Sequence, residues 1–397
     1  AQAILLIQGA QHWQLFCNLL ENMIRRVAHF VLVAVVLGSS PRKPLKKYTI
    51  DLDLAPEERF RELALDHENS IKTLLLALRV LFSGDSAKRF LSAAHVPEEH
   101  RREMKGMASA LNLTYEDVVM ANFFYELSSF DENLPPEWQL VGERSCTGIV
   151  AQSSNGTVMH ARNQDYPPPF SLVEYHGTFM KGGKIIFEGT SYAGTISIGG
   201  TCMVPGKWSA EINARYTHKA TVEQAIDRAS KGAPSFPMLL RQGCERGGYF
   251  DSGLKYLSKT PMITSGYFTI AGAAPGEGAI LTRNASGNDT DILRLSNGLP
   301  VGKPWFLVQT NYDHWTQPPK YDDRRDNGIK DMEAIGPSNV SLDALWEVMS
   351  DKAKGSGTRG VYNSATIHTE LIIPATGEYH TYLRHNIIES QSHHIVV

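Results

Sequence analysis

One internal cysteine constrains this chain more than any other residue, because an apolar run of strand type begins directly after it. Cys146 is followed by the apolar run 147–151, and a second apolar run, 157–161, leads into a polar stretch with Arg162 and Asp165. Short apolar runs bounded by polar residues are typical of strands. If the two runs pair, the cysteine, the arginine and the aspartate meet at one end of one sheet. We expect the polar stretch to be a turn that lets both charged side chains face the cysteine.

A cut in the chain before Cys146 would give that residue a second functional group. Breaking the bond between Ser145 and Cys146 leaves a free α-amine a few bonds from the thiol, which pairs a nucleophile with a base. The thiol would itself attack the carbonyl group of Ser145, so the chain would cut itself, and the uncut chain would be inactive. A thiol with a pKa of about 8.5 is mostly un-ionised at acidic pH and needs such a base. Taken alone, a cysteine in this strand context is more often an inert buried residue.

Four segments of the chain resemble signature sequences of one enzyme family. They are residues 117–126, 146–151, 309–315 and 322–325, and they occur in the order that the family shows. On these motifs the chain resembles the family of acid ceramidase and N-acylethanolamine acid amidase, over roughly residues 48–385. The resemblance implies an α+β fold, the α-β-β-α sandwich of N-terminal-nucleophile hydrolases, with a mainly helical small subunit.

By motif position, the resemblance implies catalytic roles for Cys146, Arg162, Asp165, Asn311 and Arg324. Asp165 would hold the ammonium group of the new terminus, and Arg162 would fix Asp165. The amide of Asn311 would donate to the oxyanion of the tetrahedral intermediate. Arg324 would anchor the cut-site segment or the head group of the substrate. Without the resemblance, the arginine and aspartate would be an ordinary surface pair and Asn311 a turn residue.

Two positions depart from the family pattern. The chain has Gly148 where the family usually has serine, and Ala214 where relatives have glutamate between Asn213 and Arg215. Glu211 is near in sequence, but on a strand it would point to the opposite face from residue 214, so a simple replacement is not expected. Either another acid compensates, or self-cleavage and turnover are weakened. The second outcome keeps open an inactive lipid-binding homologue.

The N-terminal stretch has the layout of a secretory signal. Arg25 and Arg26 precede the apolar run 27–37, and small residues follow it. The run is too short to span a bilayer, which takes about 20 residues. We expect translation to start at Met23 and residues 1–40 to be upstream sequence plus signal peptide. The alternative is an N-terminal helix with an apolar stripe.

Five glycosylation sequons support a secretory route to the lysosome or to the outside of the cell. Each sequon alone is a weak signal, but five behind a signal peptide favour a lysosomal or secreted glycoprotein. The acceptor residues are Asn112, Asn155, Asn284, Asn288 and Asn339.

A division at Cys146 separates a mainly helical segment, 41–145, from a strand-rich segment, 146–397. The helical segment holds a run with a capping box formed by Thr114 and Asp117. In the second segment we predict strands at 148–152, 157–161, 171–181, 184–189, 193–198, 267–271, 279–282, 306–309, 366–373 and 379–384, and helices at 222–230, 236–242 and 342–350.

The cysteines bear on how the two segments associate. Cys202 and Cys244 both lie in the second segment, and residues 41–145 contain no cysteine. A disulfide therefore cannot join the segments, and we expect a non-covalent α/β heterodimer. In this the chain resembles the acid amidase branch of the family rather than the ceramidase branch. There is no CxxC pair and no zinc-like spacing of Cys and His, so no metal or organic cofactor is expected.

Bulk composition and one apolar helix indicate the partner. Hydrophobic residues make up 42% of the chain, charged residues 20%, and the net charge is −3, so nothing favours nucleic acid. The run 71–82 is more apolar than one buried stripe requires, so part of it would line an acyl channel or touch a membrane. The alternative is a helix buried on all sides. The resemblance implies hydrolysis of fatty-acyl amides, which an acyl channel would suit, with N-acylethanolamines as the first choice and ceramide as the alternative.

Overall fold

The computed structural model describes residues 42–130, 146–166, 168–215, 217, 220–297, 302–319, 322–352 and 360–384. The chain divides into a unit of residues 1–42 and a unit of residues 43–397. The expected leader with its start at Met23, and the expected cleavage residue Ser145, lie outside the described residues.

Two β-sheets form the centre of the second unit. Within the described residues, one sheet has seven strands in the order β1-β15-β14-β4-β3-β13-β12, and the other has eight in the order β11-β10-β9-β8-β7-β6-β5-β2. The pairs are antiparallel except for β2 with β5. The strands of the first sheet are β1 Lys43–Pro44, β3 Thr147–Gln152, β4 Val158–Asp165, β12 Gly302–Lys303, β13 Phe306–Gln309, β14 Thr366–Ile373 and β15 Glu378–Leu383. Those of the second are β2 Lys47–Asp51, β5 Glu174–Lys181, β6 Lys184–Tyr192, β7 Thr201–Val204, β8 Trp208–Ala214, β9 Gly266–Gly272, β10 Gly278–Arg283 and β11 Asp291–Arg294.

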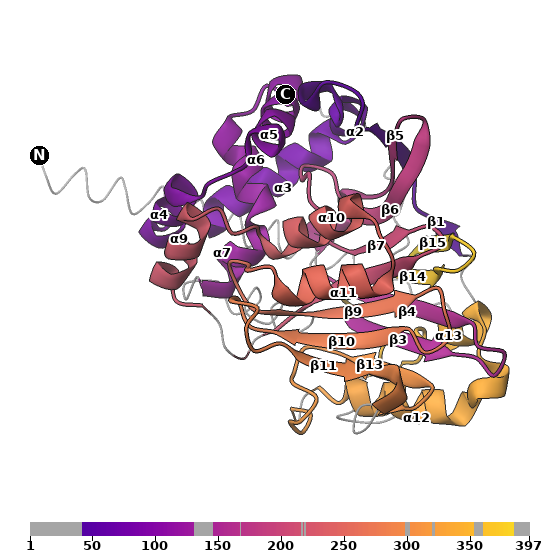
Figure 1. Ribbon diagram of the computed structural model, residues 1–397. Coiled ribbons are helices and arrows are strands. Elements are labelled where there is room, and N and C mark those ends of the chain that lie inside the picture. The colour runs from indigo at the N-terminus through magenta and orange to yellow at the C-terminus, as the bar shows by residue number, and fades with distance from the viewer. Residues whose placement is uncertain are drawn as a thin grey trace, which may run out of the picture. The chain divides into compact units, whose positions relative to one another are not determined.

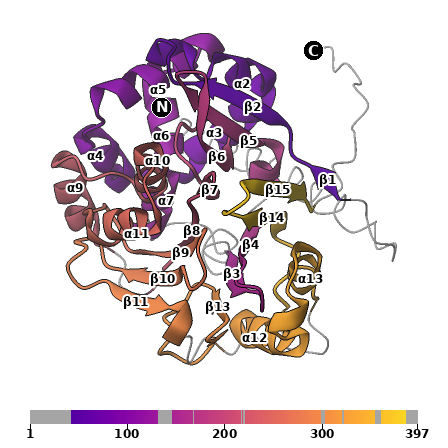
Figure 2. The ribbon, with the colours of Figure 1, turned by 45° about the vertical axis from the view of Figure 1, so that its right-hand side comes forward.

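Helices cover the outer face of each sheet, as Figures 1 and 2 show. Helices α12 (Arg324–Ile335) and α13 (Leu342–Val348) pack on β13, β4 and β14, while α10 (Phe236–Arg246) and α11 (Phe250–Lys259) pack on β6 to β9. The order of layers is therefore helix, sheet, sheet, helix, which confirms the predicted α-β-β-α sandwich. Strands β3 and β4 are buried along nearly their whole length because both of their faces are covered.

The segment before Cys146 contributes helices and two edge strands. The helices are α2 Arg61–Asp66, α3 Glu68–Leu81, α4 Asp85–Ala93, α5 Glu98–Leu111, α6 Tyr115–Asn122 and α7 Phe124–Phe130, and α9 Val222–Ser230 of the later segment packs against α4. Short 3-10 turns lie at Pro56–Glu58, Pro168–Leu172, Leu295–Asn297 and Pro337–Asn339. The predicted capping box of Thr114 and Asp117 begins α6. Strand β1 pairs with β15 and β2 pairs with β5, so this segment extends both sheets.

Buried polar contacts join the helical segment to the strand-rich segment. Arg241 on α10 binds Glu103 on α5 at 2.6 Å, and both side chains are fully buried. The side-chain oxygen of Asn122 accepts from the backbone N–H of Ile196 at 2.9 Å. One hydrophobic core cluster contains residues from both segments. The two segments are therefore held together by core packing and by paired buried charges.

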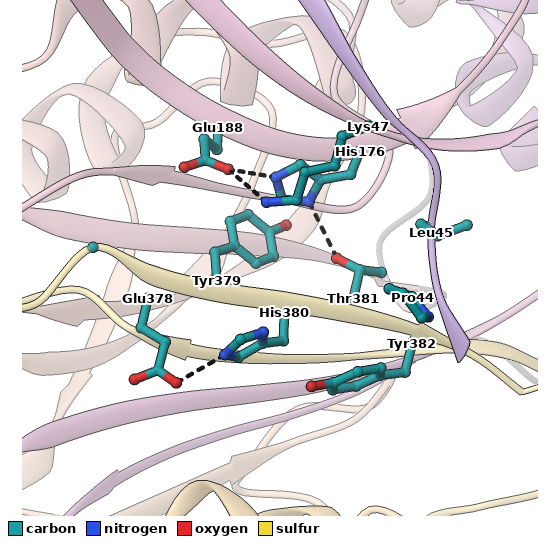
Figure 3. A pocket seen from close by; sticks show the side chains of 11 residues that line it. Pro44, Leu45, Lys47, His176, Glu188, Glu378, Tyr379, His380, Thr381 and Tyr382 are labelled. Atoms are coloured by element: carbon teal, nitrogen blue, oxygen red, sulfur yellow. Dashed lines mark hydrogen bonds and ion pairs between the residues drawn. The ribbon is translucent and has the colours of Figure 1, made fainter. Parts of the chain in front are cut away.

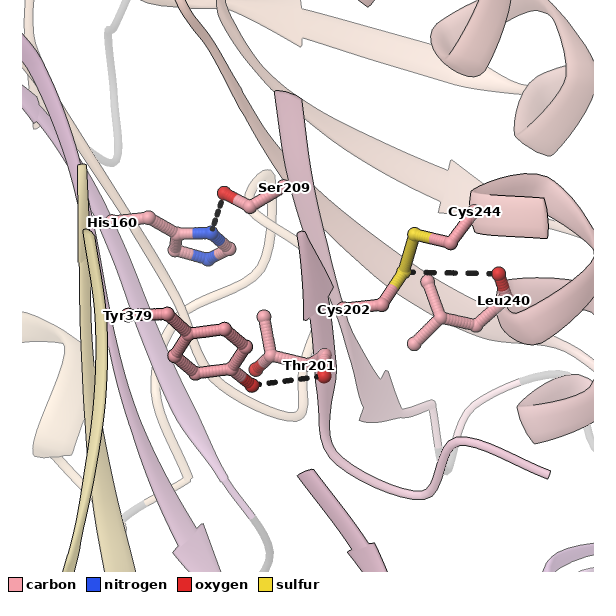
Figure 4. The surroundings of a disulfide bond; sticks show 7 residues. All are labelled: His160, Thr201, Cys202, Ser209, Leu240, Cys244 and Tyr379. Atoms are coloured by element: carbon pink, nitrogen blue, oxygen red, sulfur yellow. Dashed lines mark hydrogen bonds between the residues drawn. A yellow bond between two sulfur atoms is a disulfide. The ribbon is translucent and has the colours of Figure 1, made fainter. Parts of the chain in front are cut away.

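A disulfide fixes β7 to α10. Cys202 and Cys244 form it, with Cα atoms 6.5 Å apart, and Figure 4 shows its position. Cys146 is the free cysteine among the described residues. The disulfide lies wholly within the strand-rich segment.

The structure corrects several sequence-based expectations. Residues 193–198 are not a strand, because Gly194 turns the chain with φ of 100° and the N–H of Ile196 is bound by a side chain rather than by a ladder. The strands β7, β8 and β11 and the helices α11 and α12 were not predicted. Helix α3 is not buried on all sides, since Leu76 is 61% exposed and Val80 49% exposed. No helix among the described residues is long and apolar enough to cross a membrane.

The expected glycosylation sites differ in their surroundings. Asn284 is half-buried, and its side-chain oxygen accepts from Arg215 Nη1 at 2.8 Å. A glycan there would disturb this contact, so Asn284 is the least suited of the five. The exposed sites are Asn112, Asn155, Asn288 and Asn339.

A buried acid on α7 makes stability depend on pH. Glu126 is fully buried and accepts from the backbone N–H of Phe236 at 2.7 Å. Burial raises the pKa of Glu126 from 4.5 to about 8, although the hydrogen bond from Phe236 opposes the rise. The folded chain therefore keeps this proton over a range in which the unfolded chain loses it. Its contribution to stability is complete below pH 4.5 and declines as the pH rises toward 8.

We predict that Glu126→Gln weakens this loss of stability. Glutamine keeps the acceptor but cannot ionise, so the variant should avoid a decline of up to about 1.4 kcal/mol per pH unit across the window. Thermal melting at pH 5 and pH 8 measures it, with Glu116→Gln on the exposed face of α6 as the control. An equal fall in melting temperature in wild type and Glu126→Gln would contradict the prediction.

Candidate active site

Strands β3 and β4 bring Cys146 and Arg162 together. The two strands pair antiparallel, with Gly148 opposite Arg162, so the predicted adjacency is present. Cys146 lies directly before β3 and is 2% exposed. Arg162 Nη2 lies 3.2 Å from Cys146 Sγ and also donates to the carbonyl of Ile212 on β8 at 2.7 Å. The arginine thus bridges the thiol and the facing sheet.

Asp165 lies on the other face of β4. The polar stretch after residue 161 does not turn, because β4 continues to Asp165, and the expected turn is wrong. Since residues three apart on a strand point to opposite faces, Arg162 faces the second sheet and Asp165 faces the helices. Asp165 accepts from Asn363 at 2.6 Å, from Thr366 at 2.7 Å and from Arg324 at 3.3 Å. Arg324, rather than Arg162, is therefore the arginine that binds Asp165.

Arg324 at the start of α12 connects the residues of the site. Its Nε and Nη2 donate to the two carboxylate oxygens of Asp322, each at 2.7 Å. Its Nη1 donates to the carbonyl of Cys146 at 3.1 Å, as well as to Asp165. Its Nη2 also donates to Asn311 Oδ1 at 2.9 Å. One fully buried guanidinium thus holds the backbone at the expected cut, the aspartate and the amide in fixed positions.

The amide of Asn311 is oriented at both ends. Asn311 follows β13, and while its oxygen accepts from Arg324, its Nδ2 donates to the carbonyl of Ala214 at 2.9 Å. These contacts place the amide between the end of β8 and the start of α12. An amide held in this way keeps its dipole fixed, which is what a preorganised oxyanion donor needs.

The electrostatics of the site leave the thiol un-ionised. Burial raises the pKa of Cys146, and the nearby charge of Arg162 opposes the rise. Burial likewise raises the pKa of Asp165, against the effect of Arg324 and of the hydrogen bonds from Thr366 and Asn363. Burial alone would lower the pKa values of the two arginines, but the neighbouring anionic groups raise them, so both stay cationic. The thiol therefore requires a base for ionisation.

The backbone at Cys146 is strained. Its φ is 63°, a left-handed conformation that an L-residue with a side chain adopts at a cost of about 1–2 kcal/mol. Such conformations persist only where surrounding contacts impose them. The hydrogen bond from Arg324 to the carbonyl of Cys146 is one such contact.

Sequence reasoning missed a carboxylate between the sheets. Glu211 on β8 is fully buried, and its Oε2 lies 3.6 Å from Arg162 Nε. The contact joins two sheets, so spacing along β8 cannot reveal it. The one feature of the sequence that could have indicated this contact is glycine at residue 148, where the family usually has serine. A Cβ at that position would lie 1.6 Å from Glu211 Oε1.

Two cavities lie away from the cysteine. One of about 280 Å³ is shown in Figure 3, where His176 binds Glu188 at 2.6 Å beside Lys47 and Tyr379. The other, of about 710 Å³, lies between the end of α10 and α11. Cys146 lines neither of them. Among the described residues no group of three or more His, Cys, Asp or Glu side chains has an arrangement that would hold a metal ion.

Comparison with known proteins gives relatives along most of the chain. The N-acylethanolamine-hydrolyzing acid amidase of Cavia porcellus is 33% identical over 299 residues, which is 73% of this chain and 75% of that protein. The protein of that name from Oryctolagus cuniculus is 31% identical over 87% of this chain and 91% of its own. Acid ceramidase of Pan troglodytes is 27% identical over 87% and 88%.

A family model and a solved structure agree with these relatives. The model described as the beta subunit of N-acylethanolamine-hydrolyzing acid amidase matches residues 43–85, ahead of Cys146. A structure described as a Caenorhabditis elegans ortholog of the same amidase matches with a TM-score of 0.51 and 25% identity. It covers 60% of this chain and 99% of that chain.

We predict that Arg324→Lys destabilises the fold more than the same change at its neighbour Arg325. Lysine keeps the charge but loses the planar fork that binds Asp322 at two points, so the unfolding free energy should fall by about 1.5–3 kcal/mol. Denaturant unfolding measures it. Arg325 is a matched control, because it is buried on the same helical turn and donates to the backbone carbonyls of Asp313 and Thr316. Equal losses in the two variants would contradict the prediction.

Proposed function

The chain belongs to the family of N-acylethanolamine-hydrolyzing acid amidase and acid ceramidase, and we propose that it is a cysteine amidohydrolase that cuts itself before Cys146. The cut form would hydrolyse N-acylethanolamines to a fatty acid and ethanolamine in the lysosome or outside the cell. The observation that carries the proposal is the set of contacts from Arg324 to Cys146, Asp165 and Asn311. Membership of the family supports an amidohydrolase activity, and the contacts support the roles proposed for these residues.

Self-cleavage begins at the strained residue. The thiol of Cys146 attacks the carbonyl carbon of Ser145, the C–N bond breaks, and the nitrogen leaves as the α-amine of Cys146. A thioester between Ser145 and Cys146 Sγ then reacts with water, which yields a carboxylate and a free thiol. The positive φ of Cys146 supports this step. The angle φ is measured from the carbonyl carbon of the preceding residue, so the strain disappears when the bond between that carbon and the nitrogen of Cys146 is cut.

Amide hydrolysis then uses the two groups of the new terminus. The α-amine takes the thiol proton, the thiolate attacks the amide carbon, and the proton passes to the departing amine. The amide of Asn311 donates to the oxyanion, a contact typically worth about 2.7–4 kcal/mol in the barrier. Asp165 holds the terminal ammonium in place. The positive charge of Arg162 stabilises the thiolate form of the sulfur that it contacts. Water releases the fatty acid from the thioester. Burial of the thiol in the uncut chain supports an inactive precursor.

The cut chain would remain a non-covalent dimer of residues 41–145 and 146–397. The buried pair of Arg241 and Glu103 supports this, because each partner comes from a different segment. The shared hydrophobic core supports it as well. Cys202 and Cys244 already bind each other, and no cysteine occurs in residues 41–145.

The choice of substrate rests on similarity and on one surface. Identity to the amidases reaches 33%, against 27% for acid ceramidase, which favours an ethanolamide over ceramide. Leu76 and Val80 are exposed on one helix, α3, which suits a peripheral contact with a membrane that holds the lipid. Ala214 favours the alternative of an inactive lipid-binding homologue, and self-cleavage of the wild-type chain at acidic pH decides between the two.

We predict that Cys146→Ala abolishes both reactions. Without the sulfur, neither the thioester at Ser145 nor the acyl-enzyme can form, so the chain should stay as one band on a denaturing gel after acid treatment. Release of fatty acid from palmitoylethanolamide should fall to background. Cys202→Ala is the control for loss of a cysteine. Hydrolysis by Cys146→Ala at the parent rate would refute the proposal.

We predict a preference for palmitoylethanolamide over ceramide at acidic pH. The two substrates share the fatty-acyl amide and differ in the leaving amine, so the ratio of their kcat/KM values measures recognition of the amine. The acid-treated chain is assayed with each lipid in the same detergent. A strong preference for ceramide would overturn the choice of substrate and leave the chemistry at Cys146 intact.

A further inference from the structure

A buried carboxylate contacts the arginine that contacts the thiol. Oε2 of Glu211 lies 3.6 Å from Arg162 Nε and 3.6 Å from His160 Nε2. Nη2, on the same edge of the guanidinium as Nε, reaches Cys146 Sγ and the carbonyl of Ile212. Glu211 and Arg162 are both buried between the two sheets. Contacts at two nitrogens of one edge therefore limit rotation of the guanidinium.

Glycine at position 148 makes room for this carboxylate. Gly148 is the cross-strand partner of Arg162. A Cβ at Gly148 would lie 1.6 Å from Oε1 of Glu211 and 2.5 Å from its carboxyl carbon. Backbone atoms of β3 cannot withdraw without breaking the ladder to β4 and β13. Glu211 in this position therefore requires glycine at residue 148.

The neighbours of Glu211 orient it toward Arg162. Nδ1 of His160 is hydrogen-bonded to Ser209 Oγ at 2.9 Å (Figure 4), which fixes the ring. Nε2 of the same ring lies 3.6 Å from Glu211 Oε2. Both carboxylate oxygens of Glu211, together with Nε and Nη1 of Arg162, are buried with no hydrogen-bond partner within the described residues. A buried carboxylate with so few partners is costly, and the opposing charge of Arg162 is what offsets the cost.

A second carboxylate, on the strand next to β4, helps to compensate the positive charge of Arg162. Glu370 on β14 is the cross-strand partner of Arg162, and it accepts from His368 Nε2 at 3.0 Å. The charges of Glu211 and Glu370 both raise the pKa of Arg162. Glu370 is paired with His368. Within the described part of the chain, Glu211 has ion-pair contacts with Arg162 and His160, and Arg162 is the one that always carries a positive charge.

We propose that Glu211, seated over Gly148, is a positioning residue that holds Arg162 with Nη2 at the sulfur of Cys146. The inference rests on the proposed function, since it concerns the cysteine as nucleophile. Among the described residues the ion-pair partners of Glu211 are Arg162 and His160, so Glu211 acts on the sulfur through the arginine. Its loss frees the guanidinium to rotate, and a misplacement of about 1 Å in such a site can cost about 100-fold in rate.

Two variants and their combination test the proposal. Glu211→Gln removes the charge and keeps the shape, while Gly148→Ala displaces the carboxylate from Arg162. Each should lower kcat for palmitoylethanolamide by about 10- to 100-fold with little change in KM. Because both act on one contact, the double variant should be no slower than the slower single variant. Glu103→Gln is the control, a fully buried carboxylate bound to Arg241 in another part of the fold. It should lower the melting temperature and leave kcat unchanged.

A second measurement separates this inference from the proposed function. The charge of Glu211 is among those that raise the pKa of Cys146. In Glu211→Gln the pH midpoint for alkylation of Cys146 by iodoacetamide, read by peptide mass, should therefore move to lower pH. Absence of self-cleavage and of amide turnover in wild type would refute the proposed function. The shift in the alkylation midpoint of Cys146 could still be measured on such a chain. Wild-type kcat in Glu211→Gln, an unchanged alkylation midpoint, or multiplied losses in the double variant would each overturn the inference.

Discussion

The contact on which the site depends is that between the guanidinium of Arg324 and the backbone carbonyl of Cys146. Arg324 is fully buried, and Asp322 compensates its charge with two hydrogen bonds of 2.7 Å. Breaking a buried pair of this kind typically costs about 3–5 kcal/mol, so the start of α12 is fixed relative to β3. Because the same guanidinium binds Asp165 and Asn311, three parts of the chain that are distant in sequence converge on one residue. Structural stability and active-site geometry therefore depend on the same cation.

The two arginines of the site make their contacts on opposite faces of the first sheet. Arg324 acts on the face covered by helices, where it holds the main chain and Asp165. Arg162 acts on the face toward the second sheet, where it meets the sulfur and Glu211. This division follows from the period of two along β4, which places residues 162 and 165 on opposite faces.

Local patterns in the sequence predicted what depends on neighbouring residues. The runs around Cys146 predicted two paired strands, and Thr114 with Asp117 predicted the start of α6, because strand pairing after a short connection and helix capping are local. Residues 193–198 were predicted as a strand and form a loop, since a side chain from α6 binds the N–H of Ile196. The contacts of Glu211 and Arg324 join separate sheets and helices, so no spacing in the sequence could reveal them. The turn expected before Asp165 failed because pairing with β14 extends β4 through polar residues.

The account stands on scission of one peptide bond by the residue that follows it. The most direct test is intact mass analysis of the purified wild-type chain before and after incubation at acidic pH. Two fragments are expected, with masses that place the cut between Ser145 and Cys146 and a free cysteine at the new N-terminus. A chain that remains whole, or that is cut elsewhere while hydrolysing lipid amides, would contradict it.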